Sequence, residues 1–244
     1  MKLNCDLGEG YGSWSIGLDS QAMKLINMAN IACGFHASDA DIMAKTVALA
    51  IQNNVSIGAH PGYNDKQGFG RRSIPHTAEQ ITNLVTYQTG ALQAICKYLG
   101  SSVDYIKPHG ALYNDMMDKI DIFEAIVKAT AGCMERPTLM ILAQSSNKKY
   151  QSLAMQYGVK LLYEAFADRA YTNEGKLTSR LIKGSVYSDE KDIIRQVTQL
   201  NEQGTVTSID GHTIKLNADT ICVHGDNEAS ISILKQLCAE IHAK

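Results

Sequence analysis

Four of the seven histidines follow short apolar, strand-like runs, in segments rich in Gly, Asp, Asn or Pro. They are His36 in NIACGFHASD, His60 in VSIGAHPGYND, His109 in DYIKPHGALYN and His224 in TICVHGDNE. Histidine titrates near neutral pH and serves as a general base or a metal ligand. Asp6 ends a fifth run of this kind, LNCDLGEGYG, and Glu9 follows it. Polar residues at the ends of successive buried strands form the active sites of (β/α) barrels, so we expect an enzyme or one component of an enzyme complex.

The acids of the first segment have two explanations. Asn4 and Asp6 share one face of a strand by period two, and Asp6 lies at the strand end. A charge at a buried strand end is costly unless it is paired or used, which favours a function for Asp6 and Glu9. The alternative is that both acids cap or solvate a turn.

The histidines can act in acid–base chemistry or in metal binding. Metal-binding pairs often have HxH or HxxxH spacing, and neither spacing occurs here. Ligands can also come from different strands, and Asp6, His36 and His60 are the candidates for a divalent metal. The alternative for His60, whose backbone is stiffened by Pro61, is a hydrogen-bonded structural role.

Three cationic residues, Lys107, Arg71 and Arg72, are candidates for binding a charged ligand. Lys107 lies in a run that is typical of a buried strand, so it needs a counter-charge or a functional pocket. Asp6 or Glu164 can supply that charge. Arg71 and Arg72, in GFGRRSIP, suit bidentate binding of a carboxylate or phosphate, and a solvated basic turn is the alternative.

A strand-end acid also occurs in LLYEAFADRAY, where Glu164 is followed by Asp168 and Arg169. Two carboxyl groups in different environments can form an acid–base pair. Salt bridges from Asp168 to Arg169, or from Glu164 to Arg180, are a compatible alternative that would order the loop.

These residues are separated by alternating strand-like and helix-like segments. The strand-like runs are short, apolar and typical of parallel strands covered on both faces; they are residues 2–6, 29–33, 55–59, 103–107, 138–142, 159–164 and 219–223. The helix-like segments are residues 39–54 and 77–99, and about 118–131, 147–157, 189–203 and 227–242. Alternation implies parallel pairing with right-handed crossovers. We predict a seven-stranded (β/α) barrel forming one domain over residues 1–244, with an open doubly wound sheet as the alternative.

One segment departs from this alternation. Asp210-Gly211 stands between two alternating runs, which predicts a β-hairpin at residues 205–217, inserted before the last barrel strand. His212, near the tip of this hairpin, is expected on the surface.

Composition excludes several classes of protein. The 244 residues carry a net charge of -2, without a basic stripe, so nucleic acid is not an expected partner. No apolar run approaches the roughly 20 residues that span a bilayer, and no signal segment is apparent, so we expect a cytoplasmic protein without membrane contact. The six cysteines form no CxxC pair. No GxxxxGK phosphate loop, GxGxxG helix start or GxSxG elbow occurs, so we expect no Walker-type ATP site in this chain.

Taken together, the motifs resemble the LamB/YcsF family. The matching segments are LNCDLGEGYG, NIACGFHASD, GAHPGYND with GFGRR, KPHGALYN, EAFADRAY and CVHGDN. The resemblance implies a distorted seven-stranded barrel related to the glycoside hydrolase/deacetylase superfamily. It also implies ATP-dependent opening of the lactam 5-oxo-L-proline (pyroglutamate) to L-glutamate by a 5-oxoprolinase, in a complex with partner subunits B and C. One departure is Ser38 with Asp39-Ala40, where the family has Gly and Asp-Pro; it affects a helix start rather than the chemistry.

The resemblance also implies which residues form the site. The candidates for catalysis are Asp6, Glu9, His60, Lys107, His109, Glu164 and Asp168. The candidates for substrate binding are Asn4, Asn30, His36, Arg71, Arg72, Arg169 and His224. ATP is expected as a co-substrate handled with the partner subunits, and a divalent metal as a further cofactor.

The chemistry of a lactam fits these residue types. Phosphorylation of the amide oxygen would make the ring carbon electrophilic, so that water activated by His60 or a carboxylate can attack it. Lys107 and Arg71 or Arg72 can hold the developing phosphate charge. Two other functions stay open: a metal-dependent amidohydrolase or deacetylase acting alone, and a non-catalytic component that binds the lactam for its partners.

Overall fold

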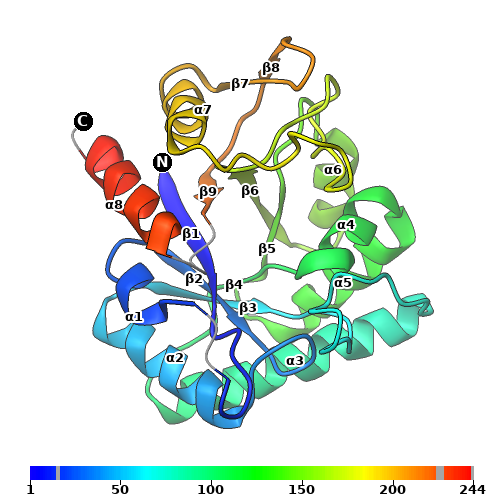
Figure 1. Ribbon diagram of the computed structural model, residues 1–244. Helices are drawn as coiled ribbons and strands as arrows, with labels where there is room; N and C mark the ends of the chain where they lie inside the picture. Colours follow the sequence, from blue (N-terminus) through cyan, green and yellow to red (C-terminus); the bar gives the residue numbers. More distant parts are fainter. Residues whose placement is uncertain (15–16, 224–227, 243–244) are drawn as a thin grey trace.

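The strand-like runs form a closed ring of parallel strands with helices around it (Figure 1). The computed structural model describes residues 1–14, 17–223 and 228–242. Within these residues the ring consists of β1 (Lys2–Leu7), β2 (Met28–Ala32), β3 (Ser56–His60), β4 (Tyr105–Ile106), β5 (Thr138–Leu142), β6 (Lys160–Phe166) and β9 (Thr220–Cys222). Because β9 pairs with both β6 and β1, the barrel is closed. The predicted barrel is confirmed, and the open sheet is excluded.

Six of the predicted strands lie within two residues of the observed bounds, and β4 is much shorter than predicted. The run predicted at residues 103–107 has only Tyr105 and Ile106 in the ladder. The Lys107 N–H still donates to the Ala59 carbonyl at 2.8 Å, but Pro108 has no N–H to continue the pairing. Lys107 therefore stands just beyond the strand, at the carboxyl end of the barrel.

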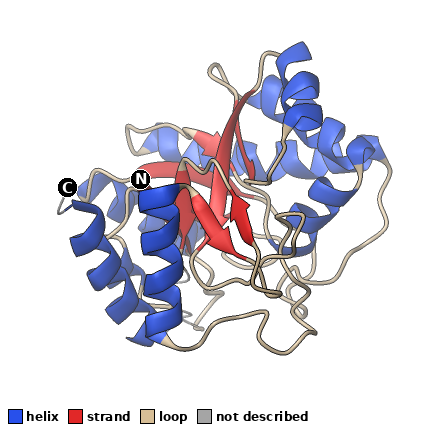
Figure 2. Cartoon of the chain, turned by 90° about the horizontal axis from the view of Figure 1, so that it is seen from above, coloured by secondary structure: helices blue, strands red, loops and turns tan. Residues whose placement is uncertain are grey.

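The helices pack outside the ring, as Figure 2 shows in a view from above. They are α1 (Asp19–Ala22), α2 (Ala40–Gln52), α3 (Ala78–Tyr98), α4 (Gly110–Asp118), α5 (Ile120–Cys133), α6 (Lys148–Gln156), α7 (Glu190–Gln203) and α8 (Glu228–His242). Asp39 caps α2 by accepting from the N–H groups of Asp41 and Ile42, and Thr77 forms a capping box with Gln80 on α3. Helices α1 and α4 were not predicted.

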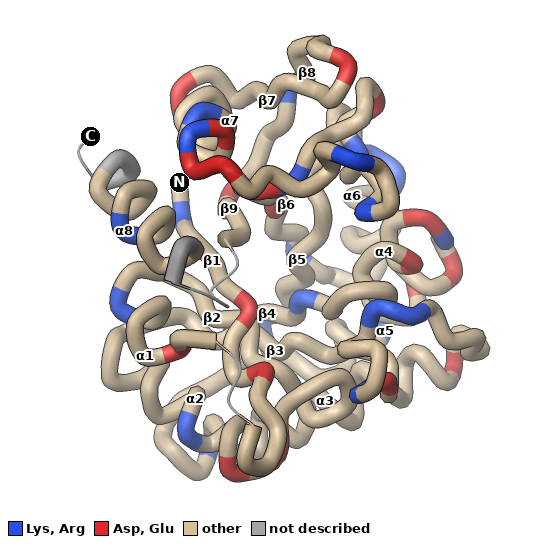
Figure 3. The backbone as a smooth tube through the Cα atoms, viewed as in Figure 1, with Lys and Arg blue, Asp and Glu red and all other residues tan. Residues whose placement is uncertain are grey.

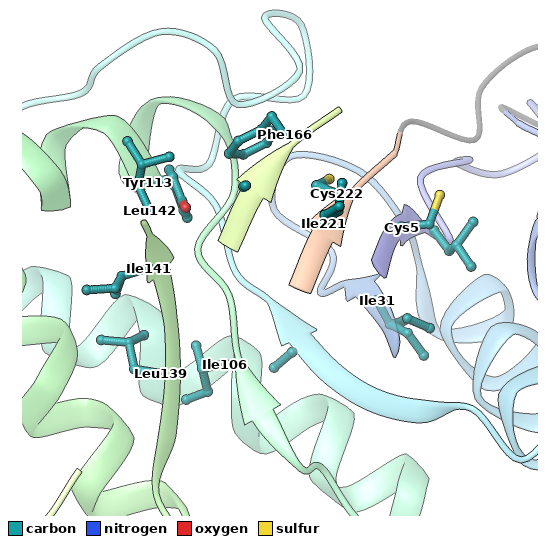
Figure 4. Close-up of a cluster of buried hydrophobic side chains, with 14 of the residues drawn as sticks. Cys5, Ile31, Ile106, Tyr113, Leu139, Ile141, Leu142, Phe166, Ile221 and Cys222 are labelled. Carbon is teal, nitrogen blue, oxygen red and sulfur yellow. The ribbon is translucent and has the colours of Figure 1, made fainter. Parts of the chain in front are cut away.

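The strands separate two packed layers. Inside the barrel, Met28, Tyr105 and Met140 form a small buried cluster against Leu162. A larger apolar cluster packs the outer faces of the strands against the helices. Figure 4 shows part of the larger cluster. Met28 begins β2 and Tyr105 begins β4, so this interior cluster lies toward the amino end of the barrel.

Gly58 on β3 makes room for the Tyr105 ring on the neighbouring strand. A Cβ at Gly58 would lie 2.2 Å from that ring, so Gly58→Ala is expected to lower the free energy of unfolding by about 1–3 kcal/mol. Gly90→Ala is the matched control, because a Cβ there meets nothing within 4 Å and alanine favours helix α3. Urea unfolding measures both variants. A Gly58→Ala chain as stable as the wild type would contradict this packing.

The predicted β-hairpin is confirmed as a separate antiparallel pair, β7 (Thr205–Thr207) and β8 (Thr213–Lys215). His212 is exposed near its turn, as expected. Among the described residues, no helix has the length and apolar character needed to cross a membrane.

Candidate active site

The carboxyl ends of the strands surround a cavity of about 520 Å³. The predicted site residues that line it are Asp6, Glu9, His60, Arg71, Lys107, His109 and Arg169. Residues 176–181, from the long connection between β6 and α7, form part of the outer wall. Figure 3 shows charged positions on the outer helices and also along the chain near the ends of β1 and β4.

Lys107 is the centre of a buried charge cluster. Its Nζ lies 2.9 Å from Asp6 Oδ1 and 2.7 Å from Glu164 Oε1, and the exposed fractions of the three side chains are 3%, 14% and 0%. Burial alone lowers the pKa of Lys107, but attraction by Asp6, and then by Cys222 and Glu164, raises it well above its ordinary value. Lys107 is therefore charged at neutral pH, and both predicted counter-charges are present.

An amide network below this cluster orients Asp6. Asn30 Nδ2 donates to Asp6 Oδ1 and to Asn4 Oδ1, both at 2.8 Å. The Tyr105 hydroxyl donates to Asn30 Oδ1 at 2.7 Å, which turns the Asn30 amino group toward Asp6. Asn4 in turn donates to Thr220 Oγ1 at 3.0 Å. Asn4 and Asn30, expected to bind substrate, thus lie in the barrel interior beneath Asp6.

Tyr105→Phe tests this network, because it leaves the buried Asn30 carbonyl oxygen without its donor. We expect the free energy of unfolding to fall by about 1–3 kcal/mol. Tyr98→Phe, at a tyrosine that is 89% exposed, should change it by less than about 0.5 kcal/mol. Chemical unfolding of both variants provides the comparison, and equal stabilities would show that the Tyr105 hydroxyl does not order Asn30.

Three histidines meet beside the charge cluster. His60 Nδ1 donates to the Lys107 carbonyl at 2.7 Å, and His109 Nε2 donates to the Phe69 carbonyl at 2.8 Å. The His36 ring stacks on the His109 ring with a centroid separation of 3.7 Å. Burial lowers the pKa of His36 and of His109 well below the ordinary value.

Glu9 and Asp6 reach the same histidines. Glu9 Oε1 lies 3.2 Å from His36 Nε2 and 3.4 Å from His109 Nδ1. Asp6 Oδ2 lies 3.4 Å from His60 Nε2. Two carboxylates and three imidazoles therefore meet at one side of the cavity, with His36 packed behind the lining residues, an arrangement suited to proton transfer.

The connection between β3 and α3 holds His109 in place. Phe69, whose carbonyl accepts from His109, has a φ of 53°, which is unusual for a bulky residue. The Asp65 carboxylate pairs with the Arg72 guanidinium across this loop, and hydrogen bonding by Arg72 lowers the pKa of Asp65 to about 2. Arg72 is not among the residues lining the cavity, so its expected contact with substrate stays a prediction.

The other predicted residues are placed differently. Arg169 lines the cavity, but its guanidinium donates to the carbonyls of Thr178 and Ser185. Asp168 is not a lining residue, so its catalytic role also stays a prediction. His224 lies outside the described residues.

Several residues around the cavity were missed from the sequence. Tyr105 lies two positions before Lys107, so period two along the strand was a signal that could have placed both on one face. Tyr113 lines the cavity, and burial, with the nearby Glu164, raises its pKa well above the ordinary value. Phe69 and the 176–181 wall had no comparable signal.

The fold and the site define a closed parallel (β/α) barrel protein with a lysine–carboxylate cluster and buried histidines at its strand ends. A family model described as the LamB/YcsF family matches residues 1–244, and the chain belongs to that family.

Similar proteins match nearly the whole chain. A Vibrio campbellii protein, named as the A subunit of 5-oxoprolinase, is 53% identical over 97% of this chain and 94% of its own length. A Vibrio parahaemolyticus protein of the same name is 51% identical over 100% of this chain and 96% of its own length. A Thermus thermophilus structure titled as a lactam utilization protein is 32% identical with a TM-score of 0.92, and the match covers 100% of this chain and 96% of that one.

Proposed function

We propose that the chain functions as the A subunit of a 5-oxoprolinase, in the ATP-dependent hydrolysis of 5-oxo-L-proline to L-glutamate. The names of the relatives support this reaction. The observation that carries the proposal is the ion-paired Lys107 beside His60 and His109 in one cavity. Opening a lactam requires proton transfer and stabilisation of negative charge, and this cluster offers both.

The chemistry of each side chain suits it to a different role in the proposed reaction. Asp6, whose Oδ2 lies 3.4 Å from His60 Nε2, is the candidate to take a proton from attacking water. Lys107 is held charged and stabilises negative charge that develops on the lactam oxygen. Arg71 lines the cavity and suits the carboxylate of the substrate, which a guanidinium binds in a bidentate manner.

The proposed reaction also requires ATP and two partner subunits. The chain carries no Walker-type loop in its sequence, so ATP is handled with partner subunits B and C. Phosphorylation of the lactam oxygen by ATP would release ADP and activate the ring carbon, and the cavity of this chain would then receive the activated ring. Attack by water, loss of phosphate and cleavage of the ring C–N bond would give L-glutamate.

Reconstitution tests the proposal. Glutamate release from 5-oxoproline is measured with the chain alone, with both partner subunits, and with and without ATP. We expect release only in the complete complex with ATP. ATP-independent release by the chain alone would indicate a stand-alone amidohydrolase instead.

Substitutions distinguish a catalytic chain from a component that only binds the lactam for its partners. Asp6→Ala and Lys107→Ala are assayed in the complete complex, and calorimetry with 5-oxoproline measures binding by each variant. Full turnover by both variants would remove the basis for a catalytic site in this chain.

A further inference from the structure

The contact between His60 and His109 joins two ring nitrogens whose tautomers are set by the carbonyl groups on the other side of each ring. A carbonyl oxygen only accepts hydrogen bonds, so His60 carries its proton on Nδ1 toward Lys107, and His109 carries its proton on Nε2 toward Phe69. In neutral rings, the remaining nitrogens are then His60 Nε2 and His109 Nδ1, and they lie 2.9 Å apart. Two lone pairs at this distance repel each other unless a cation lies between or beside them.

Two further donors face the same point. Glu9 Oε1 lies 3.4 Å from His109 Nδ1 and 3.2 Å from His36 Nε2. One ligand atom from each of the four residues lies within 4.8 Å of the others. Ligand atoms at about 2.0–2.1 Å from a tetrahedral zinc ion are roughly 3.3 Å apart. The separations of 2.9, 3.2 and 3.4 Å are close to this value, and the widest pair, within 4.8 Å, would move closer on binding. A proton shared by His60 and His109 joins only two of these four atoms, whereas one metal ion can bind all four.

We propose that Glu9, His36, His60 and His109 form a binding site for a divalent transition metal of the Zn²⁺ type. Three imidazoles and one carboxylate suit Zn²⁺ better than Mg²⁺ or Ca²⁺, which prefer oxygen ligands. The set differs from the sequence expectation, since Glu9 and His109 join His36 and His60, while Asp6 Oδ1 is occupied by Lys107 and Asn30. A metal at such a site polarises a carbonyl group or lowers the pKa of bound water.

Hydrogen bonds from the surroundings already orient two of the four ligands, His60 and His109. The carbonyls of Lys107 and Phe69 accept the outer N–H groups of His60 and His109, which is how metal-binding histidines are usually oriented. A Cβ at Gly62 would lie 2.8 Å from His36 Nδ1, so that nitrogen faces the backbone while Nε2 faces Glu9. The site is therefore preorganised by the fold.

Metal binding by the full chain tests the proposal without the partner subunits or any substrate. The purified chain is stripped with a chelator and titrated with Zn²⁺ by calorimetry, and with Co²⁺ by visible absorption. We expect one ion per chain, a rise in Tm on binding, and the d–d bands of low-symmetry Co²⁺ coordinated by nitrogen. A folded chain that gives no heat, no Tm shift and no Co²⁺ bands would overturn the proposal, whatever its activity in the complex.

Substitutions then locate the ion. His109→Gln and Glu9→Gln are each expected to weaken Zn²⁺ binding by more than about 100-fold, beyond the loss typical of residues that only orient a ligand. His212→Gln, at an exposed histidine on the hairpin, is the matched control and should bind as the wild type does. Circular dichroism checks that each variant is folded. Unchanged binding in both folded site variants, or an equal loss in His212→Gln, would place the ion elsewhere and reject the assignment.

Discussion

Lys107→Met is expected to lower the free energy of unfolding by about 3–5 kcal/mol and to abolish turnover in the complete complex. Lys107 lies between Asp6 and Glu164, and its side chain is only 3% exposed. Methionine has a similar length but no charge, so two carboxylates would remain in the barrel without their cation. Removal of one partner of a buried ion pair costs more than the pair itself contributes, because the remaining charge is left desolvated.

A second substitution separates the charge effect from packing. Lys107→Met combined with Glu164→Gln should recover part of the lost stability, because an amide needs no counter-charge, but it should not recover turnover. Lys176→Met is the matched control, since this lysine is 55% exposed and lies 3.5 Å from Asp118, and its loss should cost less than about 1 kcal/mol. Equal stability of Lys107→Met and wild type in urea would contradict the buried ion pair.

The difference in unfolding free energy between the wild type and Lys107→Met should depend on pH in a defined direction. The pKa of Lys107 is raised in the folded chain, so its contribution is complete below the ordinary lysine pKa of about 10.4. As the pH rises above that value toward the folded-state pKa, the contribution is lost. The stability difference between wild type and Lys107→Met should therefore stay constant from neutral pH to about pH 10 and narrow above it.

Asp6→Asn is expected to reduce turnover of the complete complex by about 10²–10⁴-fold, the usual contribution of a group that transfers a proton. Asp6 lines the cavity, and its two oxygens face different partners. Oδ1 accepts from Asn30 and Lys107, whereas Oδ2 lies 3.4 Å from His60 Nε2. Asparagine keeps the size of the side chain but removes the negative charge and the basic oxygen that can take a proton from attacking water.

ATP-dependent glutamate release measures this loss, and the melting temperature shows whether the variant is folded. Asp219→Asn provides the matched control, because Asp219 accepts from the Tyr163 N–H just before β9, at the opposite end of the barrel. We expect near wild-type turnover from the control. A folded Asp6→Asn complex with wild-type turnover would exclude Asp6 from the chemistry.

Local sequence determined the architecture and most of the site. Short apolar runs alternating with amphipathic segments indicate parallel strands with covering helices, because hydrophobic periodicity reflects which faces are buried. The strand ends then place Asp6, His60, Lys107 and His109 at one edge of the barrel, where the structure brings them together. The need of a buried lysine for a counter-charge pointed to Asp6 or Glu164 as its partner, and the structure pairs Lys107 with both.

Only the tertiary structure decided which atoms meet. Lys107 and Asp6 are 101 positions apart, and their 2.9 Å contact depends on the closure of the barrel. The route of the loop before α3 determined that Phe69 orients His109 while Arg72 pairs with Asp65. Side-chain periodicity is a local property of the chain, whereas closure and loop conformation depend on packing throughout the domain. For this reason the sequence indicated the edge at which the chemistry lies, and the fold selected the particular donors and acceptors.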